Sequence, residues 1–140
     1  MILLAEDSEN DAVLFKETLK RAGVWNRVMV VRDGEETMAY LKGEGKFSNR
    51  EEYPFPRIVF LDLTMPKVNG WEVLDWVKSN PRLDDLFMVV LTGGNQLSEM
   101  RRAYQAGARS FLVKPCRVQD LENLAGLYPH YWDRRLGGRG

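Results

Sequence analysis

Reactive side chains stand directly after four short apolar runs of this sequence. In chain order they are an acid pair, an acid, a hydroxyl and an amine: Glu6-Asp7, Asp62, Thr92 and Lys114. A polar residue that ends a buried strand lies at the rim of a sheet, where open α/β folds hold their ligands. We therefore expect these side chains to share one site.

Three of these side chains are carboxylates, and together they need a cation. The carboxyl ends of adjacent strands converge, so Glu6, Asp7 and Asp62 should lie close together. Their repulsion would raise their pKa values unless a cation neutralised them. An all-oxygen ligand set favours Mg²⁺ or Mn²⁺ over Zn²⁺, and the backbone carbonyl of Thr64 is the natural further ligand.

Asp62 is the carboxylate best placed to attack a phosphoryl group, because it stands at the tip of a central strand. The metal, the Thr92 hydroxyl and the Lys114 ammonium would bind the oxygens of that group. This predicts an aspartyl phosphate. Each residue alone has an ordinary interpretation, as a turn, a cap or a solvated charge. The joint arrangement favours the chemistry, because separate strand ends supply each required residue type.

Length and composition indicate one globular domain. The chain has 140 residues, is 44% hydrophobic and 29% charged, and carries 20 acidic and 20 basic residues, so no net charge favours nucleic acid or a membrane. Without a leader or a membrane span, we expect a cytoplasmic protein. Cys116 is the only cysteine, which excludes an internal disulfide; we expect it to be partly buried and inert, although a reactive thiol near Lys114 is the alternative.

Apolar runs alternate with segments of helical period, which is typical of a parallel sheet covered on both faces. Strands are expected near residues 2–5, 27–31, 57–62, 87–92 and 110–113. Helices are expected at 9–22 before Gly23, from Asp33-Gly34 through Leu41, from Asn69-Gly70 to Asn80-Pro81, at 97–106 before Gly107, and from Val118 to Pro129.

Two segments are harder to interpret from the sequence. The first helix has Val13, Leu14, Glu17, Thr18 and Arg21 at three-and-four spacing, which predicts one shared face. Residues 43–56 are polar and contain two glycines and two prolines, so they predict a long surface loop. Such a loop is either functional or a tolerated insertion.

Four motifs together resemble those of a known family. They are Leu4-Ala5-Glu6-Asp7, the run from Phe60 to Gly70, Leu91-Thr92-Gly93-Gly94 and Val113-Lys114-Pro115. With them the chain resembles a receiver domain of two-component response regulators over nearly its whole length. The resemblance implies a flavodoxin-like, doubly wound α/β fold, with a five-stranded parallel sheet in the order 2-1-3-4-5 and five helices.

The resemblance also assigns roles. It implies that Asp62 is the phosphoacceptor and that Glu6, Asp7 and Asp62, with the Thr64 carbonyl, form a Mg²⁺ (or Mn²⁺) site. It also implies that Thr92 is the switch hydroxyl and that Lys114 contacts the phosphoryl group. The family's cis peptide would fall at Lys114-Pro115. On phosphorylation Thr92 would move toward the new oxygens and Phe111 would swing in behind it. A Phe111 fixed in the core is the alternative.

The loop at 43–56, the Asn80-Pro81 stop and the aromatic tail resemble stand-alone receivers that serve bacterial phytochrome kinases. Two features depart from the family. Gly93-Gly94 replaces the small residues, such as alanine, that often follow the switch hydroxyl, and so loosens the backbone. Pro129 interrupts what is commonly a continuous last helix.

We expect a single receiver domain at 1–136, a disordered tail at 137–140 and no output domain. The phosphoryl donor would be a sensor histidine kinase or phosphotransfer protein, since the one histidine, His130, lies in the tail. Output would pass to a downstream protein or through a homodimer formed by the last strand and helix, without nucleic acid or membrane. The tail around Trp132 is either a partner surface or a cap on the core.

Other functions fit the sequence less well. An aspartate-nucleophile phosphatase needs a second acid two positions after the nucleophile, but this sequence has Thr64 there. A nucleotide-binding site needs a glycine-rich phosphate loop, which the sequence lacks. A non-phosphorylated interaction module of the same fold is the remaining alternative. We expect no turnover enzyme, only Mg²⁺-dependent self-phosphorylation and slow self-dephosphorylation, because neither Thr64 nor Gly94 positions an attacking water.

Overall fold

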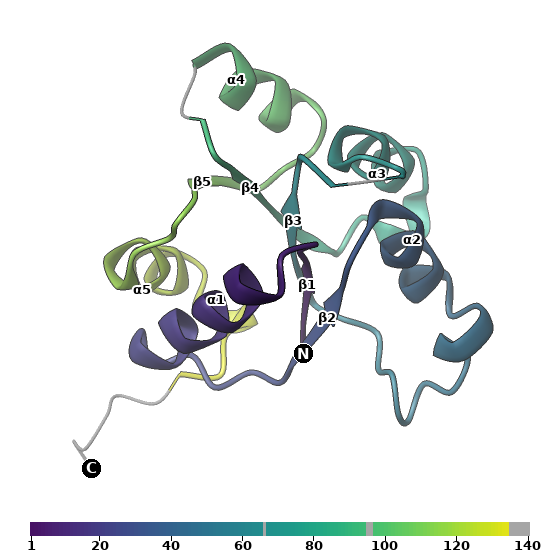
Figure 1. Ribbon diagram of the computed structural model, residues 1–140, viewed down its shortest axis with the longest axis horizontal. Coiled ribbons are helices and arrows are strands. Elements are labelled where there is room, and N and C mark those ends of the chain that lie inside the picture. The colour runs from purple at the N-terminus through teal and green to yellow at the C-terminus, as the bar shows by residue number, and fades with distance from the viewer. Residues whose placement is uncertain (66, 95–96, 135–140) are drawn as a thin grey trace.

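The computed structural model describes residues 1–65, 67–94 and 97–134 (Figure 1). Its five strands are all parallel and lie in the order β2-β1-β3-β4-β5. The strands are β1 (Ile2–Ala5), β2 (Val28–Val31), β3 (Ile58–Asp62), β4 (Phe87–Thr92) and β5 (Ser110–Val113). The helices are α1 (Glu9–Arg21), α2 (Gly34–Lys42), α3 (Gly70–Lys78), α4 (Leu97–Gln105) and α5 (Val118–Leu127). The expected flavodoxin-like fold class is confirmed.

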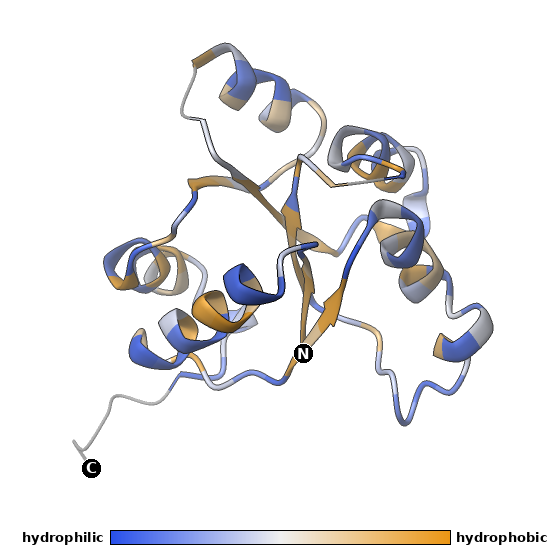
Figure 2. Ribbon diagram, in the orientation of Figure 1, coloured by the Kyte–Doolittle hydropathy of each residue, from blue (hydrophilic) through white to orange (hydrophobic). Residues whose placement is uncertain are grey.

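Helices cover both faces of the sheet and enclose two apolar cores. Leu3 and Ala5 of β1 point into one core, beneath α2 and α3, and Ile2 and Leu4 point into the other, beneath α1 and α5. Figure 2 shows the corresponding pattern, with hydrophobic strands at the centre and helices that are hydrophobic on one side. No described helix has the length and apolar character needed to span a bilayer.

The strand register brings the polar strand ends to one edge. Ala5 pairs with Leu61, Asp62 with Leu91, and Thr92 with Val113. The same rim therefore holds Glu6, Asp62, Thr92 and Lys114, because parallel strands point the same way.

Capping residues set where the helices begin and end. Ser8, Asp33 and Asn69 each accept a hydrogen bond from the backbone of the first turn that follows them, as N-caps do. Gly23 and Gly43 take positive φ angles of 80° and 70° just beyond α1 and α2, a conformation that favours glycine. The expected helix boundaries agree with the structure to within one or two residues.

The stripe of α1 with three-and-four spacing lies mostly on the exposed side of the helix. Of the five residues at three-and-four spacing only Thr18 is buried, whereas Val13 and Leu14 are 56% and 53% exposed. The helix instead buries the adjacent stripe that contains Phe15 and Leu19. Phe15 packs edge-on against Phe60 of β3, with ring centres 4.7 Å apart. The aromatic contact determines which stripe faces the sheet.

The segment 43–56 is a packed extension of the α2 side of the molecule. It begins with a 3₁₀ turn, η1 (Gly45–Phe47), and Phe47 is buried against Tyr40 and Tyr53. Arg50 donates to the carbonyls of Leu41 and Tyr53 at 3.0 and 3.2 Å. Its guanidinium thereby satisfies a carbonyl at the end of α2 and holds the loop to that helix.

The aromatic tail is a cap on the core. After α5, a further 3₁₀ turn, η3 (Pro129–Tyr131), leads to Trp132, which is buried beside Phe60 and Phe87. An antiparallel bridge then joins Arg134 to Val24. Of the two interpretations of this segment, the structure supports the cap. The expected disordered end at 137–140 lies outside the described residues.

Candidate functional site

The three acids from the strand ends lie together. Glu6 and Asp62 are only 3% and 2% exposed, while Asp7 is open to solvent. Each of the three offers a carboxylate oxygen, and these oxygens all lie within 4.8 Å of one another. This geometry fits a hard divalent cation, which prefers oxygen ligands and retains some of its water.

Lys114 neutralises much of this negative charge. Its Nζ lies 2.8 Å from Glu6 Oε1, 2.9 Å from Asp62 Oδ2 and 3.4 Å from Asp11 Oδ2. Burial lowers the pKa of the Lys114 ammonium, but hydrogen bonds to Glu6 and Asp62 outweigh burial and hold that pKa above its ordinary value. The side chain is therefore a fixed cation at neutral pH.

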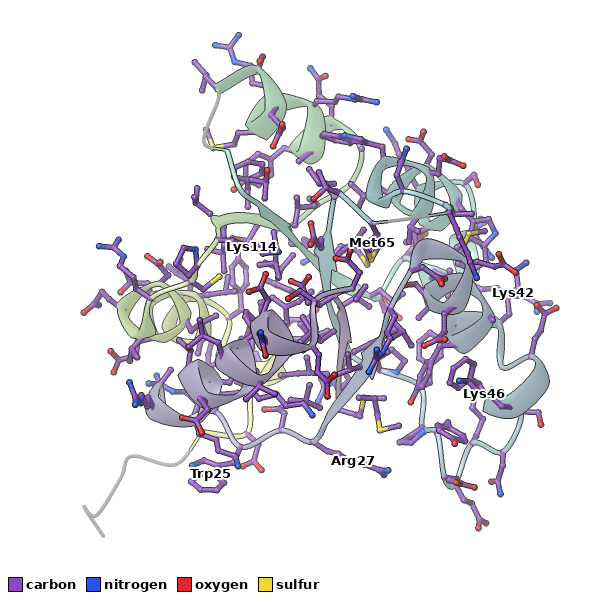
Figure 3. The ribbon with its side chains drawn as sticks, in the orientation of Figure 1. Trp25, Arg27, Lys42, Lys46, Met65 and Lys114 are labelled. Atoms are coloured by element: carbon purple, nitrogen blue, oxygen red, sulfur yellow. The ribbon has the colours of Figure 1, made fainter. Side chains whose placement is uncertain are left out.

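Both oxygens of Asp62 have partners. The backbone amide and the hydroxyl of Thr64 donate to Oδ1 at 3.0 and 3.1 Å, and Lys114 donates to Oδ2. Thr64 thus touches Asp62 through its two donors, whereas the expected role of its carbonyl as a metal ligand stays a prediction. Figure 3 places Lys114 and Met65, the residue after Thr64, on either side of the end of β3.

The surroundings of Glu6 shift its protonation. Burial raises the pKa of its carboxyl, and the hydrogen bonds from Lys114 and the Ser8 amide oppose that rise. The nearby Asp62 charge raises the pKa further. A divalent cation would oppose this rise in the pKa of Glu6, since it favours the charged forms of all three acids.

Thr92 is buried at the end of β4, but its hydroxyl faces α4. Its Oγ1 donates a hydrogen bond to Oε1 of Glu99 and accepts one from the Gly94 amide at 3.2 Å. Glu99 lies in the first turn of α4. The hydroxyl is thus held by a helix and not by the acid cluster.

Two other residues singled out by the sequence lie beside the site. Phe111 is half-buried on the α3 and α4 side of the sheet, while Leu112 lies on the opposite side, so each packs toward a helix. Cys116 is partly buried, and burial raises the pKa of its thiol to about 12. This supports the inert interpretation of Cys116. The Lys114-Pro115 peptide is cis, as the resemblance implies.

A hollow of about 330 Å³ opens beside the ammonium of Lys114. Asp11 and Leu14 of α1 form one wall, and Pro115 and Cys116 form part of the other. The side chain of Leu14 is 53% exposed at this wall. A group delivered from outside can therefore approach the acids between α1 and the chain after β5.

Sequence reasoning missed Asp11 and Glu99, which contact Lys114 and Thr92. Each is an acid in the first turn of the helix that follows a reactive strand end. An acid at that position ordinarily complements the helix dipole. The signal is visible in the sequence, but only the path of the intervening loop decides whether the side chain reaches the site.

The sequence resembles those of known response regulators over most of its length. The sequence profile of the response regulator receiver domain matches residues 2–125. The probable methanogenesis regulatory protein FilR2 of Methanothrix harundinacea is 36% identical over 135 residues, which are 94% of this chain and 83% of FilR2. Response regulator Rcp1 of Synechocystis is 33% identical over 132 residues, which are 94% of this chain and 88% of Rcp1.

Solved structures agree over the same length. Rcp1 in its Mn²⁺-bound form superposes with a TM-score of 0.78 at 30% identity, covering 96% of this chain and 97% of Rcp1. The phosphorylated cyanobacterial phytochrome response regulator RcpA gives 0.76 at 33% identity, covering 93% and 91%. With a family profile that spans most of its length, this chain belongs to the receiver domains of two-component response regulators.

Proposed function

We propose that this receiver accepts a phosphoryl group on Asp62 from a histidine kinase or a phosphotransfer protein. The observation that supports the proposal most is the environment of Asp62, a buried carboxylate held by Lys114 beside two further acids. This set contains a nucleophile, a fixed cation and oxygen ligands for a second cation. Phosphoryl transfer needs these parts, because its catalysis is mostly positioning and charge stabilisation.

The transfer is a displacement at phosphorus. One carboxylate oxygen of Asp62 forms the new bond to phosphorus, while the donor's bond to phosphorus breaks and its electron pair leaves with the donor. Lys114 already contacts Asp62 Oδ2, so a small shift brings its ammonium to a phosphoryl oxygen. The Thr64 amide and hydroxyl keep the other oxygen, Oδ1, in place.

Glu6, Asp7 and Asp62 would hold a Mg²⁺ or Mn²⁺ ion, with the Thr64 carbonyl as a fourth protein ligand. Rcp1, which resembles this chain, has been solved with Mn²⁺ bound. When bound, such an ion neutralises charge that gathers on the phosphoryl oxygens during transfer. The oxygen separations in the acid cluster support this assignment.

Receiver domains are not turnover enzymes, and here the chemistry would be limited to self-phosphorylation and self-dephosphorylation. Loss of the phosphoryl group requires a water in line with the new bond. Thr64 lies against Asp62 and Gly94 against Thr92, and neither carries a carboxylate or amide side chain to hold such a water. We therefore propose slow self-dephosphorylation; a phosphoryl lifetime of seconds would contradict it.

The donor would dock at the hollow between α1 and the chain after β5. The exposed side chain of Leu14 offers an apolar contact in the same hollow as Lys114. RcpA is a phytochrome response regulator, which supports a phytochrome kinase as donor, whereas FilR2 is named for methanogenesis.

Output would pass through protein contacts, either with a downstream protein or in a homodimer. The face of α4, β5 and α5 supports this, because it exposes Leu97, Tyr104 and Val113. Val113 is 38% exposed at the end of β5, an edge strand of the sheet. A sheet edge with exposed apolar side chains is a common protein contact surface.

Incubation with an acyl phosphate and Mg²⁺, followed by intact mass, tests the proposal. The wild-type chain should gain the mass of one phosphoryl group, and Asp62→Asn should not. Asp75→Asn, an exposed position on α3, is the matched control and should behave as wild type. Uptake by Asp62→Asn would refute the acceptor. No uptake by a folded wild type would favour the non-phosphorylated interaction module.

A further inference from the structure

The hydroxyl of Thr92 has one proton, and that proton is already in use. Oγ1 donates to Glu99 Oε1 at 2.5 Å and accepts from the Gly94 amide at 3.2 Å. A threonine hydroxyl donates only one hydrogen bond. Thr92 is also 4% exposed, so it has little access to other partners. To donate to a phosphoryl oxygen on Asp62, it must first leave Glu99.

We propose that Glu99 is a positioning residue that competes with the phosphoryl group for the Thr92 proton, so that phosphorylation releases the first turn of α4. The inference rests on the proposed function of Asp62. Both acceptors are anions, and charged acceptors form the stronger hydrogen bonds. When the phosphoryl group wins, Glu99 loses its donor. The added charge of about −1.5 to −2 also repels the Glu99 carboxylate.

Little of α4 is buried. Within α4, all of which the structure describes, Ala103 is the only buried residue. The Arg102 guanidinium stacks 3.9 Å from the centre of the Trp71 ring on α3, and Lys78 of α3 donates to the Gln105 carbonyl at 2.7 Å. These contacts fix the middle and the end of α4. Glu99 fixes its beginning, and Figure 1 shows the helix standing apart at the top of the molecule.

Gly93 and Gly94, the two residues directly after Thr92, have open space beside their backbone. A Cβ atom added at Gly93 or Gly94 would meet no atom within 4 Å. Other glycines differ, because a Cβ at Gly70 would lie 2.6 Å from the Leu63 Cα. Release of Glu99 can therefore become a displacement of the beginning of α4, with the stack of Arg102 on Trp71 as the fixed point.

Beryllium trifluoride with Mg²⁺, a stable mimic of the phosphoryl group, provides the test. Glu99→Gln replaces the charged acceptor with a neutral one of the same shape. It should load at a mimic concentration roughly three- to tenfold lower than wild type, because the competing hydrogen bond is weaker. Glu122→Gln, at an exposed position on α5, is the matched control and should load as wild type does.

The Thr92→Val background separates competition from a merely structural effect. Without the hydroxyl there is no shared proton, so adding Glu99→Gln should no longer change loading. An equal gain in this background would overturn the inference, because Glu99 would then act without Thr92. If wild type loads and Glu99→Gln loads identically, the inference fails and the proposed function stands. If wild type does not load at all, the proposed function itself fails.

Hydrogen exchange of residues 97–105 gives an independent readout. In wild type, exchange in the first turn of α4 should rise when the mimic is loaded. In Glu99→Gln it should already be raised before loading. An α4 whose exchange is unaffected by the mimic would contradict the release of this helix.

Discussion

Glu6 links the protonation of the site to its affinity for a cation. Burial raises its carboxyl pKa above the ordinary value of 4.5, so the folded chain retains a proton that the unfolded chain has lost. The contribution of Glu6 to stability is therefore present below pH 4.5 and declines as pH rises through the folded pKa. A cation needs the deprotonated form and binds better over the same pH window.

Mg²⁺ should therefore stabilise the chain more at pH 7 than at pH 5. At about ten times its dissociation constant a ligand adds about 1.4 kcal/mol, which corresponds to a rise in Tm of several degrees. Thermal unfolding with and without Mg²⁺ measures this. Asp7→Asn should lose most of the rise and Asp75→Asn should retain it. A rise of equal size at both pH values would contradict the role of Glu6.

Cys116 should react slowly in the folded chain. A thiol pKa of about 12 leaves roughly a thousandth of the thiolate that an ordinary cysteine has at pH 8, and thiolate is the reactive form. Alkylation by iodoacetamide, followed by mass, should be slower by roughly that factor than in the same chain unfolded in urea. Comparable rates in the two states would show that the thiol is not shielded.

At the scale of the elements, close backbone approach fixes how α2 and the chain after β3 meet. A Cβ at Gly34, the first residue of α2, would lie 1.8 Å from the Val68 carbonyl oxygen. Since that oxygen belongs to the backbone, the chain cannot rotate it away as it could a side chain. Because glycine has no Cβ, the start of α2 can pack directly against the segment that carries Thr64.

Gly34→Ala should therefore lower the free energy of unfolding by at least about 2 kcal/mol, because overpacking of this kind forces the backbone apart. Gly126→Ala is the matched control: position 126 lies in α5 with open space around its Cβ. There alanine should stabilise by about 0.5 to 1 kcal/mol, as in other helices. Urea unfolding of both variants measures this. A neutral Gly34→Ala would mean that the two segments can separate freely.

Strands and caps were predictable from the sequence, whereas faces and contacts were not. The strands β1, β3 and β4 are apolar runs buried on both sides, and Asp33 and Asn69 mark helix starts by their own chemistry. The sequence does not reveal which side of α1 is buried: Phe15, and not the stripe at three-and-four spacing, meets Phe60. Local periodicity carries no information about which aromatic ring lies across the sheet.

The functional site, too, was predictable from the sequence only in part. The strand ends placed Glu6, Asp62 and Lys114 together because register follows from parallel pairing. Asp11 and Glu99 depend on how loops return the chain to the sheet, and loop paths are set by tertiary packing. The expectation for residues 43–56 remained open for a similar reason, since Arg50 orders that segment through carbonyls that the sequence does not distinguish.

For the whole molecule, the tail closes the end of the sheet opposite the site. Trp132 packs beside Phe60 and Phe87, and Asn26 binds the tail by a hydrogen bond to the Tyr131 carbonyl at 3.2 Å. Truncation before Tyr128 would therefore remove part of the core. Loss of a dimer in such a truncated chain would not identify the tail as the contact surface.

Trp132→Ala should lower the free energy of unfolding by about 3 to 5 kcal/mol, the usual cost of removing a buried large aromatic side chain. His130→Ala, two residues earlier and exposed, should change it by less than about 0.5 kcal/mol. Urea unfolding followed by circular dichroism measures both. If Trp132→Ala kept full stability and altered only the mass in solution, the tail would be a partner surface after all.

The stack of Arg102 on Trp71 has a practical consequence. An indole with a guanidinium 3.9 Å from its ring centre emits in a strongly cation-perturbed environment, and that environment depends on where α4 sits. Trp71 is therefore a native optical probe of the helix, and the difference between the emission of wild type and Trp71→Phe isolates its signal. If the stack is the fixed point about which the beginning of α4 moves, this emission should stay constant while the first turn is released, and a large change on loading the mimic would show that the whole helix has moved.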